Sequence, residues 1–205
     1  MKIPKLMLIT DGSLEADSSA IDIIISACRS GLPAIQLREK SMETRKLWEL
    51  AAMLHQKTSE YKTFFSINDR IDIAIALNAD GIQLSEKSLP PQIAKKLNPS
   101  LMVGVSVHSL EMGQRAEQEG ADYLVFGPIF DTPSKRAFGP PQGLSQLKKM
   151  TSTLSIPVLA VGGITPLNAK SCIEAGAHGV AAINVFMQSQ DIKATIHDFL
   201  KEIGL

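Results

Sequence analysis

The sequence is poor in cysteine, carries no excess charge and has no long apolar run. Its two cysteines, Cys28 and Cys172, have no neighbour at metal-ligand or redox spacing, which argues against a disulfide framework or a cysteine-based metal site. Lysine plus arginine and aspartate plus glutamate number 21 each, so no global field favours nucleic acid or an anionic membrane. No stretch approaches the roughly 20 apolar residues of a membrane span, and the first apolar run is too short for a signal peptide. We therefore expect a soluble, cytoplasmic protein with no nucleic-acid or membrane partner.

The sequence does contain a regular alternation of strand-like and helix-like segments. The predicted strands are Lys5–Thr10, Ala34–Arg38, Phe64–Asn68, Gly81–Leu84, Met102–Val107, Tyr123–Phe126, Val158–Val161 and Gly179–Ile183. The predicted helices are Ser18–Arg29, Met42–Tyr61, Ile71–Leu77, Pro90–Leu97, Ser109–Glu119, Leu144–Thr151, Leu167–Ala175 and Asp191–Ile203. Such an alternation is typical of parallel strands joined by crossover helices.

Eight such units could form a closed barrel or an open, doubly wound sheet. The even spacing of the units favours the barrel, as does the lack of a G-x-G-x-x-G motif after the first strand. Polar residues also cluster at the C-terminal ends of nearly all the strands, where barrel active sites are built. No linker or composition shift divides the chain. We therefore predict an α/β fold, a single (β/α)₈ TIM barrel with one domain over residues 1–205.

Polar and basic residues end the second predicted strand, in the segment Gln36–Lys40. Side chains alternate along a strand, so Gln36, Arg38 and Lys40 should share one direction. An amide and two cations at a barrel mouth make a good cradle for phosphate oxygens. The alternative is an ordinary salt-bridged surface.

Other strand ends offer further candidates. Asp69, after the third strand, is either a Mg²⁺ ligand or the cap of the next helix. The fifth strand ends with Ser106 and His108, a hydroxyl and a titratable imidazole. The glycines Gly162 and Gly163 follow strand seven and should let the backbone approach a phosphate, although they could also form a simple tight turn.

A long connection rich in proline and glycine runs from Gly127 to Gly143. A loop of this length in a small barrel is usually a lid or a binding loop, and its prolines limit its freedom. The segment carries the polar residues Thr132, Ser134 and Lys135. We predict a lid over the mouth, the alternative being a disordered surface excursion.

Taken together, these motifs resemble the thiamine phosphate synthase/TenI family over essentially the whole chain. The matching segments, in the family's order, are Gln36–Lys40, Ile67–Arg70, Ala79–Leu84, Gly104–His108, Phe126–Phe130 with Thr132–Lys135, and Gly162–Ile164. In the synthase, hydroxymethylpyrimidine diphosphate loses pyrophosphate and joins thiazole phosphate, which gives thiamine monophosphate. The resemblance therefore implies a Mg²⁺-dependent transferase of thiamine biosynthesis whose partners are small phosphates, and it leaves a homo-oligomer open.

The resemblance also implies a role for each matching residue. The pyrimidine would contact Gln36 and Ser106. The diphosphate would be held by Asn68 and by three catalytic cations, Arg38, Lys40 and Lys135. The thiazole phosphate would bind at Thr132, Ser134, Gly162, Gly163, Ile183 and Asn184. Asp69 would ligate Mg²⁺, and no protein nucleophile would be needed.

The sequence departs from the family pattern at two places. The second carboxylate ligand of the synthase is replaced by Ser88, and we expect Glu86 to serve as a metal ligand instead. The acid/base histidine of the tautomerases is replaced by Pro128, which leaves His108 as the nearby substitute. Besides a synthase, the sequence is therefore compatible with a TenI-type thiazole tautomerase, or with a non-catalytic protein that binds a thiamine-related phosphate.

Overall fold

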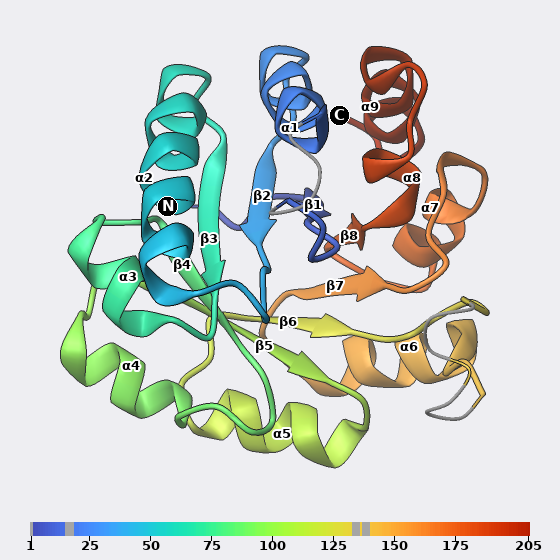
Figure 1. The fold of residues 1–205 in the computed structure, drawn as a ribbon. Coiled ribbons are helices and arrows are strands. Elements are labelled where there is room, and N and C mark those ends of the chain that lie inside the picture. Colours follow the sequence, from blue (N-terminus) through green and yellow to red (C-terminus); the bar gives the residue numbers. More distant parts are fainter. Residues whose placement is uncertain (1, 15–18, 133–135, 137–139) are drawn as a thin grey trace.

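The computed structural model describes residues 2–14, 19–132, 136 and 140–205, which include eight parallel strands closed into a barrel (Figure 1). The strands are β1 (Leu6–Ile9), β2 (Ala34–Leu37), β3 (Phe64–Asn68), β4 (Gly81–Leu84), β5 (Met102–Val107), β6 (Tyr123–Phe126), β7 (Val158–Val161) and β8 (Gly179–Ala182). Each strand pairs with its neighbours in the chain, and β8 closes on β1. The prediction of a (β/α)₈ TIM barrel is confirmed.

Helices surround this barrel (Figure 1). They are α1 (Ser19–Arg29), α2 (Thr44–Glu60), α3 (Ile71–Ala76), α4 (Pro91–Leu97), α5 (Leu110–Gln118), α6 (Gly143–Thr153), α7 (Pro166–Glu174), α8 (Asn184–Met187) and α9 (Ile192–Glu202). Helix α8 was not predicted, and Asn184, one of the residues expected to bind the thiazole phosphate, is the first residue of this helix. Four residues make barely more than one turn, so α8 has no periodicity that a sequence pattern could reveal.

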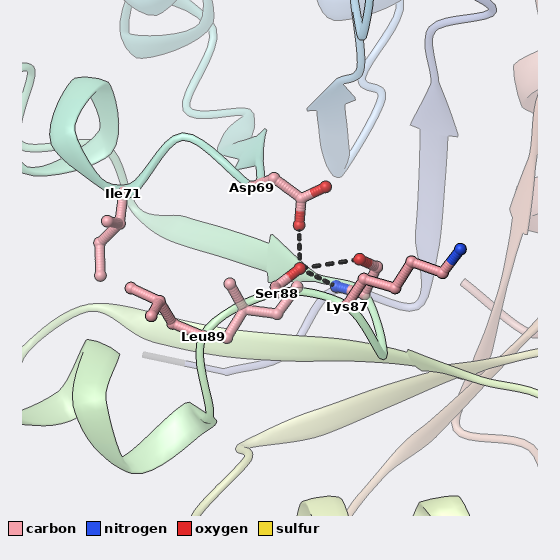
Figure 2. A pocket seen from close by; sticks show the side chains of 7 residues that line it. Asp69, Ile71, Lys87, Ser88 and Leu89 are labelled. Carbon is pink, nitrogen blue, oxygen red and sulfur yellow. Dashed lines mark hydrogen bonds between the residues drawn. The ribbon is translucent and has the colours of Figure 1, made fainter.

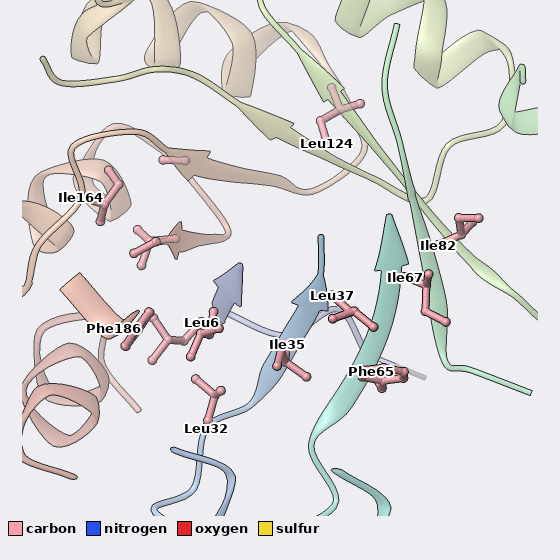
Figure 3. Close-up of a cluster of buried hydrophobic side chains, with 14 of the residues drawn as sticks. Leu6, Leu32, Ile35, Leu37, Phe65, Ile67, Ile82, Leu124, Ile164 and Phe186 are labelled. Carbon is pink, nitrogen blue, oxygen red and sulfur yellow. The ribbon is translucent and has the colours of Figure 1, made fainter. Parts of the chain in front are cut away.

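Two separate apolar clusters hold the fold together. The larger one lies between the strands and the helices and includes Leu6, Ile35, Phe65 and Phe186 (Figure 3). The smaller one fills the barrel and contains Met7, Ile9, Ala34, Phe64, Tyr123, Val125, Leu159 and Ala181. In β1, β2, β3, β6, β7 and β8, alternate residues contribute to the two clusters, as the two-residue repeat of a strand requires. Residues that alternate with the larger cluster therefore face the barrel interior.

Both cysteines are free and buried. Burial raises the pKa of the Cys172 thiol to about 11, so this thiol stays protonated near neutrality and packs as a small apolar group. Among the described residues, no helix combines the length and the apolarity needed to cross a membrane.

Candidate active site

A polar layer lies inside the barrel near the C-terminal ends of β2 to β5. It consists of Gln36, Asn68, Gln83 and Ser106, which follow the interior positions of their strands. Gln36 Nε2 donates to Asn68 Oδ1 at 3.2 Å, and Gln83 Nε2 donates to Ser106 Oγ at 3.0 Å. The structure thus brings together three of the predicted site residues and adds Gln83, to which the sequence analysis gave no role.

The remaining strands line the interior with apolar side chains. Ile9 of β1 and Val125 of β6 belong to the interior cluster, and Val161 of β7 and Ile183 after β8 pack against it. Near its mouth, the barrel interior therefore has a polar wall, made by β2 to β5, and an apolar wall, made by β6 to β8 and β1. A ligand that enters the mouth meets hydrogen-bonding groups on one side and apolar groups on the other.

Asp69 follows the polar wall and, together with Ser88, lines a cavity of about 270 Å³ (Figure 2). Its backbone has a φ of 58°, a left-handed conformation that aspartate adopts more readily than most residues. Its Oδ2 accepts a hydrogen bond from Asn68 Nδ2 at 2.9 Å, and its Oδ1 accepts one from the Ser88 hydroxyl. Ser88 Oγ in turn accepts from the backbone N–H of Ser85 at 2.7 Å. The hydroxyl that replaces the family's second carboxylate therefore lies directly against Asp69.

These residues offer one carboxylate to a metal ion. The described part of the chain contains no group of three or more His, Cys, Asp or Glu that could hold a metal. Glu86 is exposed and does not line the cavity, whereas Lys87 does. Mg²⁺ is commonly held by one or two carboxylates together with substrate phosphates. The chemistry of this donor set therefore fits Mg²⁺ only when a ligand supplies phosphate oxygens.

The end of β2 carries the two predicted cations. The strand stops at Leu37. Strand alternation therefore sets the direction of the Gln36 side chain but not the directions of Arg38 and Lys40. Arg38 is half-buried and Lys40 is exposed, and in the described residues neither pairs with a carboxylate. Two cations without a counter-charge remain available to an anion.

Between these cations lies Glu39, a buried carboxylate that the sequence analysis did not single out. Its two oxygens accept hydrogen bonds from Thr10 Oγ1 at 2.7 Å and from the backbone N–H of Leu14 at 3.3 Å. Thr10 Oγ1 also accepts from the backbone N–H of Arg38 at 2.8 Å. Burial raises the pKa of Glu39, and these hydrogen bonds oppose that rise. Glu39 thus connects the loop after β1 to the loop that presents Arg38. The sequence feature that could have predicted its burial is its position two residues after the buried Leu37.

The backbone turns after β7 and β8 form the other side of the mouth. Gly162 and Gly163 have positive φ angles of 95° and 65°, and they lie against the segment after β6. A Cβ atom at Gly162 would be 2.5 Å from Pro128 Cβ, a distance that no side chain tolerates. Both glycines therefore form a tight turn, and this turn lies where barrels commonly build a phosphate site. Asn184 is exposed at the start of α8, a short helix of the kind that adds to such sites.

The long connection between β6 and α6 is pinned at its two ends. Ile129 and Phe130 donate backbone hydrogen bonds to Val161 and Gly162, and Gly143 donates one to Ile129. Near its tip, Arg136 pairs with Asp131 at 2.5 Å. Thr132 is half-buried, while Ser134 and Lys135 lie outside the described residues.

His108 is anchored beside this connection. Its Nδ1 lies 2.6 Å from the carbonyl oxygen of Gly127, and because a carbonyl can only accept, Nδ1 carries the proton. The ring atom that remains for a ligand is Nε2.

Comparison with known proteins agrees with this geometry. The family model described as thiamine monophosphate synthase matches residues 6–186. The thiamine-phosphate synthase of Pyrococcus furiosus is 38% identical over 96% of this chain and 93% of its own length. The thiamine-phosphate synthase of Clostridium novyi is 37% identical over 92% and 93%.

The solved structures lead to the same family. The thiamine phosphate pyrophosphorylase of Pyrococcus furiosus superposes with a TM-score of 0.88 at 36% identity and covers 98% of this chain and 95% of that one. A 3-hexulose-6-phosphate synthase, at 15% identity and a TM-score of 0.71 over 98% and 100% of the two chains, shares the fold alone. Since the family model and these relatives span nearly all of the sequence, the chain belongs to the thiamine monophosphate synthase family.

Proposed function

We propose that this protein is a thiamine-phosphate synthase that joins hydroxymethylpyrimidine diphosphate to thiazole phosphate and releases pyrophosphate. The observation that carries the proposal is the divided barrel mouth. A hydrogen-bonding wall suits a heteroaromatic ring, and beside it lie Asp69 and two cations, Arg38 and Lys40, that pair with no carboxylate within the described residues. Small phosphates are its partners, and the cytoplasm is its place of action, in keeping with two buried, unpaired cysteines.

The site residues divide the work by chemistry. Gln36 and Ser106 bind the pyrimidine, while Arg38, Lys40, Lys135 and Asn68 hold its diphosphate. The thiazole phosphate binds across the mouth, at Thr132, Ser134, Gly162, Gly163, Ile183 and Asn184. This arrangement would place the thiazole nitrogen on the apolar side and the leaving diphosphate beside the cations.

The reaction exchanges one bond for another at a single carbon. The bond between the pyrimidine methylene and the diphosphate oxygen breaks, and its electron pair leaves with pyrophosphate. The thiazole nitrogen donates its lone pair to the same carbon, which gives thiamine monophosphate. Cations fixed beside the diphosphate stabilise the negative charge as it develops on the leaving group. The apolar wall, with Val125 and Val161, limits water near the electron-poor carbon.

Mg²⁺ is the proposed cofactor, and Asp69 would hold it together with diphosphate oxygens. When bound, it would neutralise charge on the departing pyrophosphate. Asn68 and Ser88 hold the Asp69 carboxylate in place through their hydrogen bonds. Glu86, exposed outside the cavity, would need its loop to move before it could contribute.

One observation favours a second candidate function, that of a thiazole tautomerase. His108 is held by the Gly127 carbonyl with Nε2 free to accept a proton, although Pro128 occupies the family's usual base position. Incubation of the purified protein with both substrates and Mg²⁺ separates the two. Thiamine monophosphate with one pyrophosphate per product supports the synthase. Isomerised thiazole phosphate without coupling would contradict it and favour the tautomerase.

A further inference from the structure

Gln83 is a fully buried amide that touches the site without being part of the proposed ligand contacts. It lies in β4, and its Nε2 donates a hydrogen bond to Ser106 Oγ at 3.0 Å. An amide N–H can only donate, so Ser106 acts as the acceptor of this bond. The hydroxyl proton of Ser106 is thereby directed elsewhere, and Ser106 is left as a hydrogen-bond donor toward a ligand.

The other side of the Gln83 amide lies beside Gly104 and Tyr123. A Cβ atom at Gly104 would be 2.3 Å from Gln83 Oε1 and 2.5 Å from the Tyr123 hydroxyl oxygen. Gln83 Oε1 and the Tyr123 hydroxyl are both buried, and neither has a hydrogen-bond partner within the described residues. The bond to Ser106 is therefore the hydrogen bond that gives the Gln83 amide its direction.

Gln36 has the opposite polarity. Its Nε2 donates to Asn68 Oδ1, and Asn68 Nδ2 donates in turn to Asp69 Oδ2. This chain of amides, ending on a carboxylate, fixes Gln36 so that Oε1 is its remaining group. Oε1 is buried and has no hydrogen-bond partner within the described residues, which makes it an available acceptor.

We propose that Gln83 is a positioning residue that sets the hydrogen-bond polarity of the site. By donating to Ser106, it directs the Ser106 proton toward the ligand. The Ser106 donor and the Gln36 acceptor together match a ring that carries an amino group beside a ring nitrogen. The amino group donates to Gln36, and the ring nitrogen accepts from Ser106. The deaminated, 4-oxo form presents a carbonyl oxygen to the Gln36 carbonyl oxygen and offers no ring acceptor to the Ser106 proton, so it should bind less tightly. This inference rests on the proposed function and deepens it.

The test compares Gln83→Glu with wild type, using the amino and 4-oxo forms of hydroxymethylpyrimidine diphosphate. Above the pKa of the introduced carboxyl, Ser106 must donate to the carboxylate and becomes an acceptor. We expect kcat/KM for the amino form to fall about tenfold or more, mainly through KM, and its preference over the oxo form to shrink. Burial raises the pKa of a carboxyl, so lowering the pH should protonate it and restore both values. Gln114→Glu makes the same change on the exposed face of α5 and should alter neither.

A folded Gln83→Glu protein with wild-type kcat/KM and wild-type preference at every pH would overturn the proposal. If that variant does not fold, Ser106→Ala decides the question, since it removes the donor and should lose the preference; retention of the full preference refutes the inference. Calorimetric binding of the two diphosphates gives the same comparison without turnover. A wild type that binds the amino form but forms no thiamine monophosphate would refute the synthase function alone, and the binding ratios would still decide the role of Gln83.

Discussion

At the scale of single residues, the site depends on how the Asp69 carboxylate is held. Ser88 and Asn68 each give it one hydrogen bond, so both oxygens are occupied by neutral donors. A neutral hydroxyl stabilises the carboxylate without a metal, whereas a second carboxylate would repel it unless a cation lay between them. We therefore expect the serine to weaken Mg²⁺ binding by the free protein and to make that binding depend on the substrate.

Replacement of Ser88 by Asp reverses this balance. The two carboxylates raise each other's pKa and destabilise the metal-free protein, while Mg²⁺ affinity increases. In the wild type, pyrophosphate and Mg²⁺ should each raise the affinity for the other by the same factor. Calorimetry of Mg²⁺ binding with and without pyrophosphate measures both effects, and Asp69→Asn is expected to abolish them. If Ser88→Asp leaves metal affinity and product formation at zero, the synthase function is wrong.

Glu39 gives a prediction about pH. Its pKa is raised in the folded state by burial, so folding favours the protonated form. The stability contributed by this group is therefore fully present below its unfolded pKa of about 4.3 and is lost as the pH rises through the folded pKa. In the Glu39→Gln variant, the unfolding free energy should no longer show the decrease with rising pH that Glu39 causes. Urea unfolding between about pH 4 and pH 7 tests this slope; the exposed Glu49→Gln is the matched control and should leave the slope unchanged.

At the scale of elements, the turn after β7 and the start of the β6–α6 connection depend on each other. Gly162 has a φ of 95° and lies against Pro128, while Gly120, at the end of α5, has a φ of 90° with nothing within 4 Å of its Cβ position. The two glycines share a backbone conformation and differ in their contacts. Alanine substitutions therefore separate backbone strain from close packing.

We expect Gly162→Ala to cost about 1–3 kcal/mol more unfolding free energy than Gly120→Ala, because its methyl group displaces the Pro128 segment. The same displacement should weaken binding of thiazole phosphate. Chemical unfolding and calorimetry measure the two effects. Equal costs for the two substitutions would show that the turn and the connection do not constrain each other.

The connection from Gly127 to Gly143 is pinned at both ends, and its sequence includes the proposed phosphate ligands Thr132, Ser134 and Lys135. We predict that it closes over bound ligand and shields the reacting carbon from water. Hydrogen exchange in this segment should slow with saturating thiazole phosphate or pyrophosphate. Unchanged exchange under both conditions would refute the lid.

At the scale of the whole molecule, the barrel was predictable because each strand and its helix repeat a hydrophobic pattern that local sequence carries. The predicted strands agree with the observed ones to within about a residue at each end. Helix α8 was not predicted because a single turn has no sequence period. Glu39 was not predicted because its role depends on Thr10 and Leu14, which are distant in the chain. The amide network around Gln83 likewise joins different strands, so only the closed barrel reveals its polarity.

In the proposed reaction, cations beside the diphosphate stabilise the leaving pyrophosphate, and no protein nucleophile takes part. Rapid-quench single-turnover experiments with both substrates and Mg²⁺ measure this directly. We predict that pyrophosphate and thiamine monophosphate appear at one rate, and that Arg38→Gln slows this step by about 10²–10³-fold. The claim would be contradicted by pyrimidine bound covalently to the protein, or by Arg38→Gln reacting at the wild-type rate.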